Sequence, residues 1–181
     1  KKLIPDIDWI TLSDLGIEPV DIVEGSDIEE NAKQKALAYR SLTDLPILGS
    51  DVAFVIPSIP EFDPSQVKRN ALGDRDESKL TQEEIAELIL GYYADLVTQH
   101  GGQLLAYWDD AYVLVLPDGS SKVERSRRDV TLMPEPKGEI NPYFPMRSLY
   151  IVNRSGKYVS DQTEDEEKLE LSPITEALNN L

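Results

Sequence analysis

The sequence contains no cysteine and a single histidine, and both shortages restrict its chemistry. Without cysteine there is no disulfide bridge, no thiolate metal site and no cysteine nucleophile. His100 stands just before Gly101 and Gly102, where a helix is expected to end, so a histidine-based triad or a zinc cluster is disfavoured. A metal site in this chain is therefore expected to use oxygen ligands and a hard cation.

The sequence also lacks long apolar runs and an excess of basic residues. No run approaches the about 20 residues of a membrane-spanning helix, and residues 1–5 lack the apolar stretch of a secretory signal, so we expect a cytoplasmic protein with no membrane partner. The 34 acidic and 18 basic residues give a net charge of -16, which repels nucleic acid. A small anionic substrate is still compatible with this charge, because clustered lysines or a bound divalent cation reverse the field within one cleft.

The periodicity of the chain predicts a mixture of helices and strands. Its 181 residues, 40% of them hydrophobic, suffice for one domain with a substantial core. Capping boxes at 26–29 and 81–84 predict helices that run to about Leu42 and about Gln99. Further elements are predicted as strands at 7–12, 46–56, 104–108, 111–116, 122–127 and 148–152, and as two short helices at 164–171 and 173–181. With loops and at most one short helix at 57–79, this mixture indicates an α/β or mixed α+β fold.

Two carboxylates stand out in this pattern. Glu30 lies one turn into a capped helix, and Asp51 interrupts an apolar strand. If the two converge, they form a site for magnesium, which takes one or two protein carboxylates and completes its shell with water and substrate phosphate. Alternatively, Glu30 is a solvated residue that helps the helix N-terminus. Asp51 is either functional or a turn residue at the end of a strand, because burying an unpaired charge costs several kcal/mol.

Several motifs resemble those of the inosine triphosphate pyrophosphatase family, also called Ham1-like. Residues 30–36, Glu-Asn-Ala-Lys-Gln-Lys-Ala, match its E-N-A-x-x-K-A helix motif. Residues 46–54 lie where the family has a strand ending in D-D-S-G-L, and Asp51 keeps the second aspartate. Residues 143–150 lie where it has G-F-G-Y-D-P-I-F, and residues 155–158, 166–168 and 172–178 resemble its G-K-T, E-E-K and S-H-R-x-x-A-L motifs. The motifs follow the family's order over most of the chain.

This resemblance implies a fold and an activity. The fold is a single α/β domain over residues 1–181, elongated, with a central mixed sheet flanked by helices and two lobes around a cleft. The activity is magnesium-dependent hydrolysis of non-standard purine nucleoside triphosphates (ITP, XTP and dITP) to the monophosphate and pyrophosphate. By resemblance, Glu30 and Asp51 hold magnesium or activate water, Lys35 lies near the phosphates, Phe144 stacks on the base, and Lys168 and Ser172 face the purine. Members often pair as homodimers, and an aromatic and apolar hairpin around Tyr107, Trp108 and Tyr112 either forms such an interface or packs against the central helix.

The departures from the family's motifs leave alternatives open. Ser50 and Arg147 replace carboxylates, and Pro173-Ile174 replaces the His-Arg pair. The family's first strand, with its T-x-N-x-x-K phosphate loop, is expected before Lys1, so that either the sequence is truncated or the active site has been lost. In the second case the fold serves nucleotide binding or assembly; a third alternative is a changed substrate. Lys35 is otherwise a surface lysine, Phe144 a core ring, and Lys168 with Ser172 solvated residues at a helix end.

Overall fold

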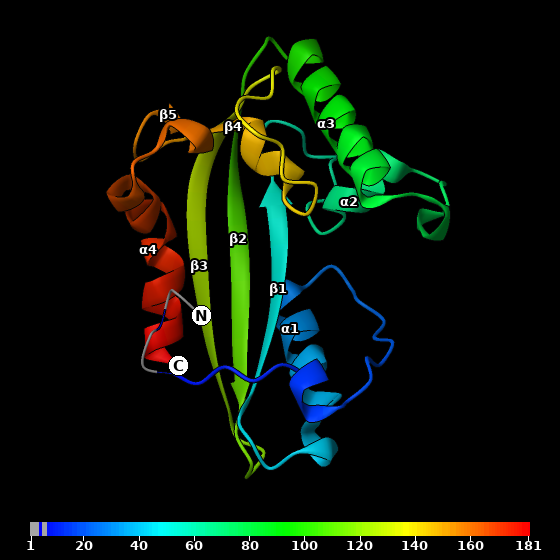
Figure 1. The fold of residues 1–181 in the computed structure, drawn as a ribbon, viewed down its shortest axis with the longest axis vertical. Helices are drawn as coiled ribbons and strands as arrows, with labels where there is room; N and C mark the ends of the chain where they lie inside the picture. The colour runs from blue at the N-terminus through cyan, green and yellow to red at the C-terminus, as the bar shows by residue number, and fades with distance from the viewer. Residues whose placement is uncertain (1–3, 5–6) are drawn as a thin grey trace. The chain divides into compact units, whose positions relative to one another are not determined.

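The computed structural model describes Ile4 and residues 7–181, and it contains a five-stranded sheet (Figure 1). The strands follow the order β1 (Ile47–Val55), β2 (Leu104–Val115), β3 (Ser121–Leu132), β4 (Tyr150–Val152) and β5 (Lys157–Tyr158). β3, β4 and β5 pair antiparallel, with Val130 opposite Val152 and Ile151 opposite Tyr158. Together with the helices, the sheet confirms the expected mixed α+β class.

Four α-helices and five short 3-10 helices accompany the sheet in the described residues. The α-helices are α1 (Ile28–Leu37), α2 (Val67–Leu72), α3 (Gln82–Gln99) and α4 (Glu164–Asn180). The 3-10 helices are η1 (Ser13–Leu15), η2 (Arg40–Leu42), η3 (Glu77–Lys79), η4 (Pro145–Ser148) and η5 (Val159–Asp161). None of the helices that the structure describes has both the length and the hydropathy of a bilayer span.

The structure corrects the expected elements in four regions of the chain. Residues 7–12 form no strand, and the helix expected to reach Leu42 ends at Leu37, with η2 following it. The two strands expected at 104–116 are one continuous strand, β2. The two terminal helices are a single helix, α4, with Pro173 inside it.

The chain forms two compact units. The first contains the described residues up to Val52, together with Asp109–Arg127 and Leu171–Leu181. The second contains Ala53–Trp108 and Arg128–Glu170.

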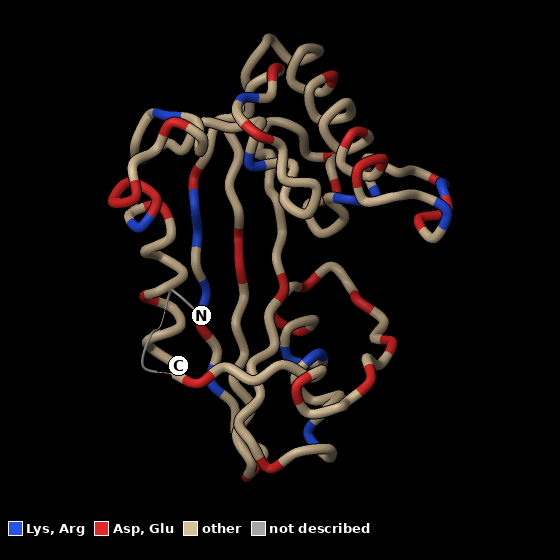
Figure 2. The backbone as a smooth tube through the Cα atoms, viewed as in Figure 1, with Lys and Arg blue, Asp and Glu red and all other residues tan. Residues whose placement is uncertain are grey.

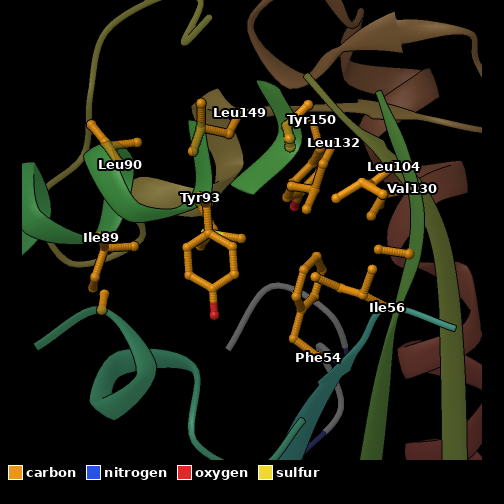
Figure 3. Packing of buried hydrophobic residues seen from close by; sticks show 14 of the residues in the cluster. Phe54, Ile56, Ile89, Leu90, Tyr93, Leu104, Val130, Leu132, Leu149 and Tyr150 are labelled. Carbon is orange, nitrogen blue, oxygen red and sulfur yellow. The ribbon is translucent and has the colours of Figure 1, made fainter. Parts of the chain in front are cut away.

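The second unit contains a hydrophobic core built around α3. Thr81 and Glu84 form the predicted capping box, and the i, i+4 spacing of Ile85, Ile89 and Tyr93 gives the helix one apolar face. Figure 3 shows the Tyr93 ring beside Phe54, and the two ring centroids lie 6.1 Å apart in an edge-to-face arrangement. This geometry is favourable for aromatic pairs, so α3 is fixed against the strand that carries Phe54.

In the first unit, α1 packs directly onto β1 at a glycine. A Cβ atom on Gly49 would lie 2.0 Å from the carbonyl oxygen of Ala32 and 2.9 Å from the amide nitrogen of Ala36. Ala32 and Ala36 are themselves fully buried. The small residues on both elements therefore bring the backbone of α1 against the strand, and this contact positions the side chains described next.

Candidate functional site

The first unit holds a charged cluster around Asp51. Asp51 lies in β1 with a side chain only 11% exposed, and its Oδ1 is 2.6 Å from the Lys35 ammonium. The amide of Asn31 donates to its Oδ2 at 2.9 Å. Lys35 also forms an ion pair of 2.7 Å with Glu24. The buried carboxylate found in the sequence is thus hydrogen-bonded at both oxygens, as a charge removed from water needs to be.

The helical period explains which side chains of α1 reach Asp51. Asn31 and Lys35 are four residues apart and therefore lie on the same face of the helix. Asn31 is buried, and its side chain also accepts from the amide of Gly25 and donates to the carbonyl of that residue. The Asp27 side chain caps the helix by accepting from the amides of Glu29 and Glu30. Both ends of the Asn31 amide are engaged, so its orientation toward Asp51 is fixed.

The surroundings of Lys35 favour its charged form. Burial lowers the pKa of this ammonium, but hydrogen bonds and charge attraction from Asp51 and Glu24 outweigh that effect, and the net result is a raised pKa. The lysine therefore stays protonated at neutral pH, and it neutralises the buried acid.

Glu30 lies outside this cluster. It is exposed, and its carboxylate accepts from the side chain of Gln34 at 3.1 Å. Glu30 precedes Asn31 by one residue, which turns it about 100° away from the face that meets Asp51. The side chains that hydrogen-bond to Asp51 are a lysine and an asparagine rather than a second acid. Binding of one metal ion by Glu30 and Asp51 together remains a prediction.

The carboxylates near Asp51 are too few to hold a metal ion without ligands from elsewhere. No group of three or more acidic or histidine side chains in the described part of the chain could hold a metal ion by itself. Magnesium needs only one or two carboxylates when phosphate and water supply its remaining ligands. Asp51 and Glu30 are carboxylates of this kind, and Lys35 would have to release Oδ1 for the metal to bind there.

The other residues predicted by resemblance are partly or fully exposed. Phe144 is 63% exposed beside η4, which argues against the alternative of a core ring. Lys168 is exposed on α4 and pairs with Glu164 at 3.1 Å and Asp165 at 3.5 Å. Ser172 is half-buried on the same helix. Phe144 and Lys168 belong to the second unit, and Ser172 belongs to the first.

The aromatic hairpin is not an exposed patch. Tyr112 is 8% exposed, and the Trp108 ring packs 4.5 Å from Phe54. These two rings therefore pack within the fold, and the homodimer itself stays a prediction.

Sequence analysis noted Arg147 only as a departure and missed its partners on α4. Its guanidinium contacts Glu170 at 3.4 and 3.5 Å and Glu167 at 3.4 Å. The Glu170 side chain is only 1% exposed, and Arg128 lies 3.9 Å from it on the second side. Burial raises the pKa of Glu170, and the two arginines partly offset that rise. One signal in the sequence could have revealed this buried acid. Glu170 stands between Leu169 and Leu171, at a position where the helical spacing favours an apolar residue.

The first unit also contains an apolar cavity of about 770 Å³. Its walls include Ile7, Ile10, Leu48 and Leu178, and Lys35 and Ser50 also line it. The cavity therefore adjoins the lysine of the Asp51 cluster.

Comparison with known proteins gives one similar curated sequence and several similar structures. No family model matches the chain. The chain is 28% identical over 183 aligned positions to a dITP/XTP pyrophosphatase of Corynebacterium efficiens, covering 98% of the chain and 84% of that relative.

The similar structures have low sequence identity and a shared fold. A nucleoside-triphosphatase / dITP/XTP pyrophosphatase from Mycobacterium abscessus has a TM-score of 0.68 at 17% identity, covering 94% of this chain and 84% of that one. The Ham1 protein of Staphylococcus aureus has a TM-score of 0.68 at 17% identity, with coverages of 99% and 90%. A HAM1 protein from Coxiella burnetii has a TM-score of 0.71 at 16% identity, with coverages of 99% and 91%. The chain resembles the Ham1-like inosine triphosphate pyrophosphatases, as its motifs predict. The resemblance covers nearly the whole length of the sequence, and it extends to the fold.

Proposed function

We propose that this protein is a nucleoside triphosphate pyrophosphatase that hydrolyses non-standard purine triphosphates, ITP, XTP and dITP, to the monophosphate and pyrophosphate, and so clears them from the nucleotide pool. The observation that carries the proposal is sequence similarity to a dITP/XTP pyrophosphatase over 98% of the chain, with the matching motif residues Asn31, Lys35 and Asp51 in one hydrogen-bonded cluster.

In this proposal Asp51 is the acid that orients or deprotonates the attacking water. Its carboxylate is largely shielded from solvent, which suits an acceptor for a water proton. Lys35 supplies positive charge for the triphosphate, and its salt bridges to Asp51 and Glu24 keep that charge in place. Phe144 supplies a stacking surface for the base, and Lys168 and Ser172 face the purine.

We also propose that magnesium is required, with Asp51 and Glu30 as its protein ligands. The metal would supply charge neutralisation at the phosphates. The proposal extends to a cytoplasmic location, where a pool of nucleoside triphosphates is available, and to pairing of two copies as a homodimer.

The test is release of pyrophosphate from ITP, XTP and dITP, with ATP for comparison. We expect release with magnesium and none after chelation with EDTA. Replacing Asp51→Asn preserves shape but removes the proton acceptor, so kcat should fall by about 100-fold to 10,000-fold. Asp118→Asn is the matched control, because Asp118 lies in an exposed turn where it accepts from Ser120. If no purine or pyrimidine triphosphate yields pyrophosphate, the enzymatic proposal is wrong.

A second candidate is a catalytically inactive nucleotide-binding or interaction protein of the same fold. It is favoured by the neutralisation of Asp51 by Lys35 at 2.6 Å and by Ser50 and Arg147 in place of carboxylates. This candidate requires nucleotide binding without turnover, so a titration monitored together with pyrophosphate release separates the two. Turnover that is lost in Asp51→Asn would exclude it.

A further inference from the structure

Lys35 lies between two carboxylates that differ in their exposure to solvent. Its Nζ is 2.6 Å from Oδ1 of Asp51 and 2.7 Å from Oε1 of Glu24. The side chain of Asp51 is 11% exposed, and that of Glu24 is 43% exposed. An ammonium group has three N–H donors, so the lysine makes both contacts at the same time. When one of the two contacts is lost, the other still holds the lysine.

The two oxygens of Asp51 have partners of different mobility. Asn31 donates to Oδ2 at 2.9 Å, and both ends of its amide are also bonded to the backbone of Gly25. Asn31 is 2% exposed, so its contact with Oδ2 is fixed. The Lys35 side chain is 28% exposed, and its four-carbon stem is flexible. The movable partner of Asp51 is therefore the lysine at Oδ1.

Glu24 is held beside α1 although it lies outside regular secondary structure. On one side of it, the amide of Val20 donates to the hydroxyl of the buried Tyr39 at 2.9 Å. On the other side, the amide of Gly25 donates to Asn31 at 2.8 Å, and its carbonyl accepts from Asn31 at 2.9 Å. These bonds tie the segment to α1 and to the residue just beyond its C-cap. The carboxylate of Glu24 thus stays within reach of the lysine when the lysine leaves Asp51.

A divalent cation at Oδ1 of Asp51 would meet the ammonium of Lys35. Two positive groups this close to each other repel, so the lysine has to leave that oxygen before a cation can bind there. A lysine that moved fully into solvent would take its charge away from the triphosphate of the proposed substrate. The contact with Glu24 offers a position in which the lysine has left Asp51 but remains in the cluster.

We propose that Glu24 is a positioning residue that keeps Lys35 in the cluster when a divalent cation replaces the lysine at Oδ1 of Asp51. In the absence of the cation, Lys35 bridges the two acids. In its presence, Lys35 pivots about Glu24 and keeps its charge beside the site. The inference rests on the proposed function, and it names the residue that lets Asp51 bind a metal while Lys35 serves the phosphates.

The exchange makes Lys35 and the cation competitors for one oxygen atom. Lys35→Met removes the ammonium and keeps an unbranched side chain. This variant should bind magnesium more tightly by about 5-fold to 150-fold, the usual range of coupling between two sites.

Glu24→Gln should have the opposite effect. The lysine then has Asp51 as its remaining acid, so it competes more strongly with the cation. Magnesium binding should weaken by about 2-fold to 5-fold, as expected for the loss of a partly exposed ion pair. In the Lys35→Met background there is no lysine for Glu24 to hold, so the same substitution should change the affinity by less than about 2-fold.

The experiment titrates magnesium chloride alone, without nucleotide, into the ¹⁵N-labelled chain. The NMR signal of the Asn31 side-chain amide gives the affinity, because this amide donates to Asp51 and therefore reports on that carboxylate rather than on the other acidic residues. The titration is repeated for each single variant and for the double variant. Thermal melting shows whether each of them is folded.

Two further variants separate the position of the acid from its charge. Glu24→Asp keeps the carboxylate and should restore most of the wild-type affinity. Asp21→Asn is the matched control, because it removes one acid from the same exposed segment. Its effect on magnesium binding should be less than about 2-fold, since exposed charges are screened by salt.

Three results would overturn the inference: no response of the Asn31 amide to magnesium in the wild type and in Lys35→Met, unchanged or weaker binding in Lys35→Met, or an equal effect of Glu24→Gln with and without the lysine. The third result would make Glu24 a metal ligand or only a source of negative charge. The predicted exchange combined with no pyrophosphate release would keep this inference and reject the enzymatic function. Magnesium-dependent pyrophosphate release combined with the third result would do the reverse.

Discussion

A single missing side chain at Gly49 sets the distance between α1 and β1. A methyl group there would lie 2.0 Å from the carbonyl oxygen of Ala32, and this atom belongs to the helix backbone and cannot rotate away. Gly49→Ala should therefore separate the helix from the strand and destabilise the protein by about 1–3 kcal/mol. Urea denaturation measures the change in the free energy of unfolding.

Gly91 offers the matched control for this substitution. It lies inside α3, and a Cβ atom there would meet nothing within 4 Å. Gly91→Ala should stabilise the protein by about 0.5–1 kcal/mol, because glycine is a poor helix former. Equal effects of the two substitutions would show that the close contact at Gly49 is not tight.

At the scale of residues, the sequence identified the central acid but not its partners. Asp51 is conspicuous because it is ionisable within an apolar run. The residues that reach it from α1 depend on how that helix is rotated, and the strongest signal in the sequence pointed to Glu30, one position before Asn31. The rotation is set by Ala32 and Ala36 against Gly49, a tertiary contact that periodicity alone does not reveal. Arg147 was likewise noted only because it replaces a carboxylate of the family's motif.

Among the elements, α4 continues through a proline that normally ends a helix. Pro173 has no amide proton to donate to the carbonyl of Leu169 four residues earlier. Arg154 donates to that carbonyl instead, with Nη1 at 3.1 Å. The Arg154 side chain, from outside the helix, thus supplies the hydrogen bond that the proline cannot make. The segment predicted as two helices is therefore one continuous helix.

A double-mutant cycle tests this substitution of one donor for another. Pro173→Ala restores an amide donor and should stabilise α4, and Arg154→Ala removes the external donor and should destabilise it. In the Pro173→Ala background the carbonyl has a helical partner, so Arg154→Ala should cost less there than in the wild type, with a coupling of about 0.5–1.5 kcal/mol. Strictly additive changes in the free energy of unfolding would contradict this account.

The other corrected elements have comparable causes. In residues 7–12 apolar and polar residues alternate as they do in a strand. This alternation indicates only which residues face a core, and the segment forms no β-sheet hydrogen bonds in the structure. Asp109 and Asp110 were expected to separate two strands within 104–116. In the structure Asp109 pairs with Arg125 at 2.6 Å and Asp110 accepts from Ser126 at 3.0 Å. These cross-strand partners on β3 let β2 run through both acids.

For the whole molecule, the order of motifs predicted more than any single element did. The fold class is confirmed although several element boundaries are not, because the class depends on the sequence of helices and strands rather than on where each one ends.

The net charge of -16 is a property of the entire chain. Repulsion among the excess acidic residues should lower the stability of the folded state. Figure 2 shows acidic residues concentrated at the start of α4 and along the segment before α1. Sodium chloride screens such repulsion, so the melting temperature should rise between about 0.05 M and about 0.5 M salt. A gain of about 1 kcal/mol corresponds to roughly 2–4 °C for a chain of this size. Lower melting temperatures at high salt would mean that attractive ion pairs outweigh the repulsion.

The position of Trp108 gives the protein an intrinsic fluorophore near Arg147. Its ring lies 6.0 Å from the Arg128 guanidinium, and Arg128 contacts the same glutamate that anchors Arg147. A shift of that glutamate changes the electric field at the indole and hence its emission. The chain has only one other tryptophan, Trp9, so Trp9→Phe leaves a single emitter that reports on rearrangement of the Glu170 cluster in real time.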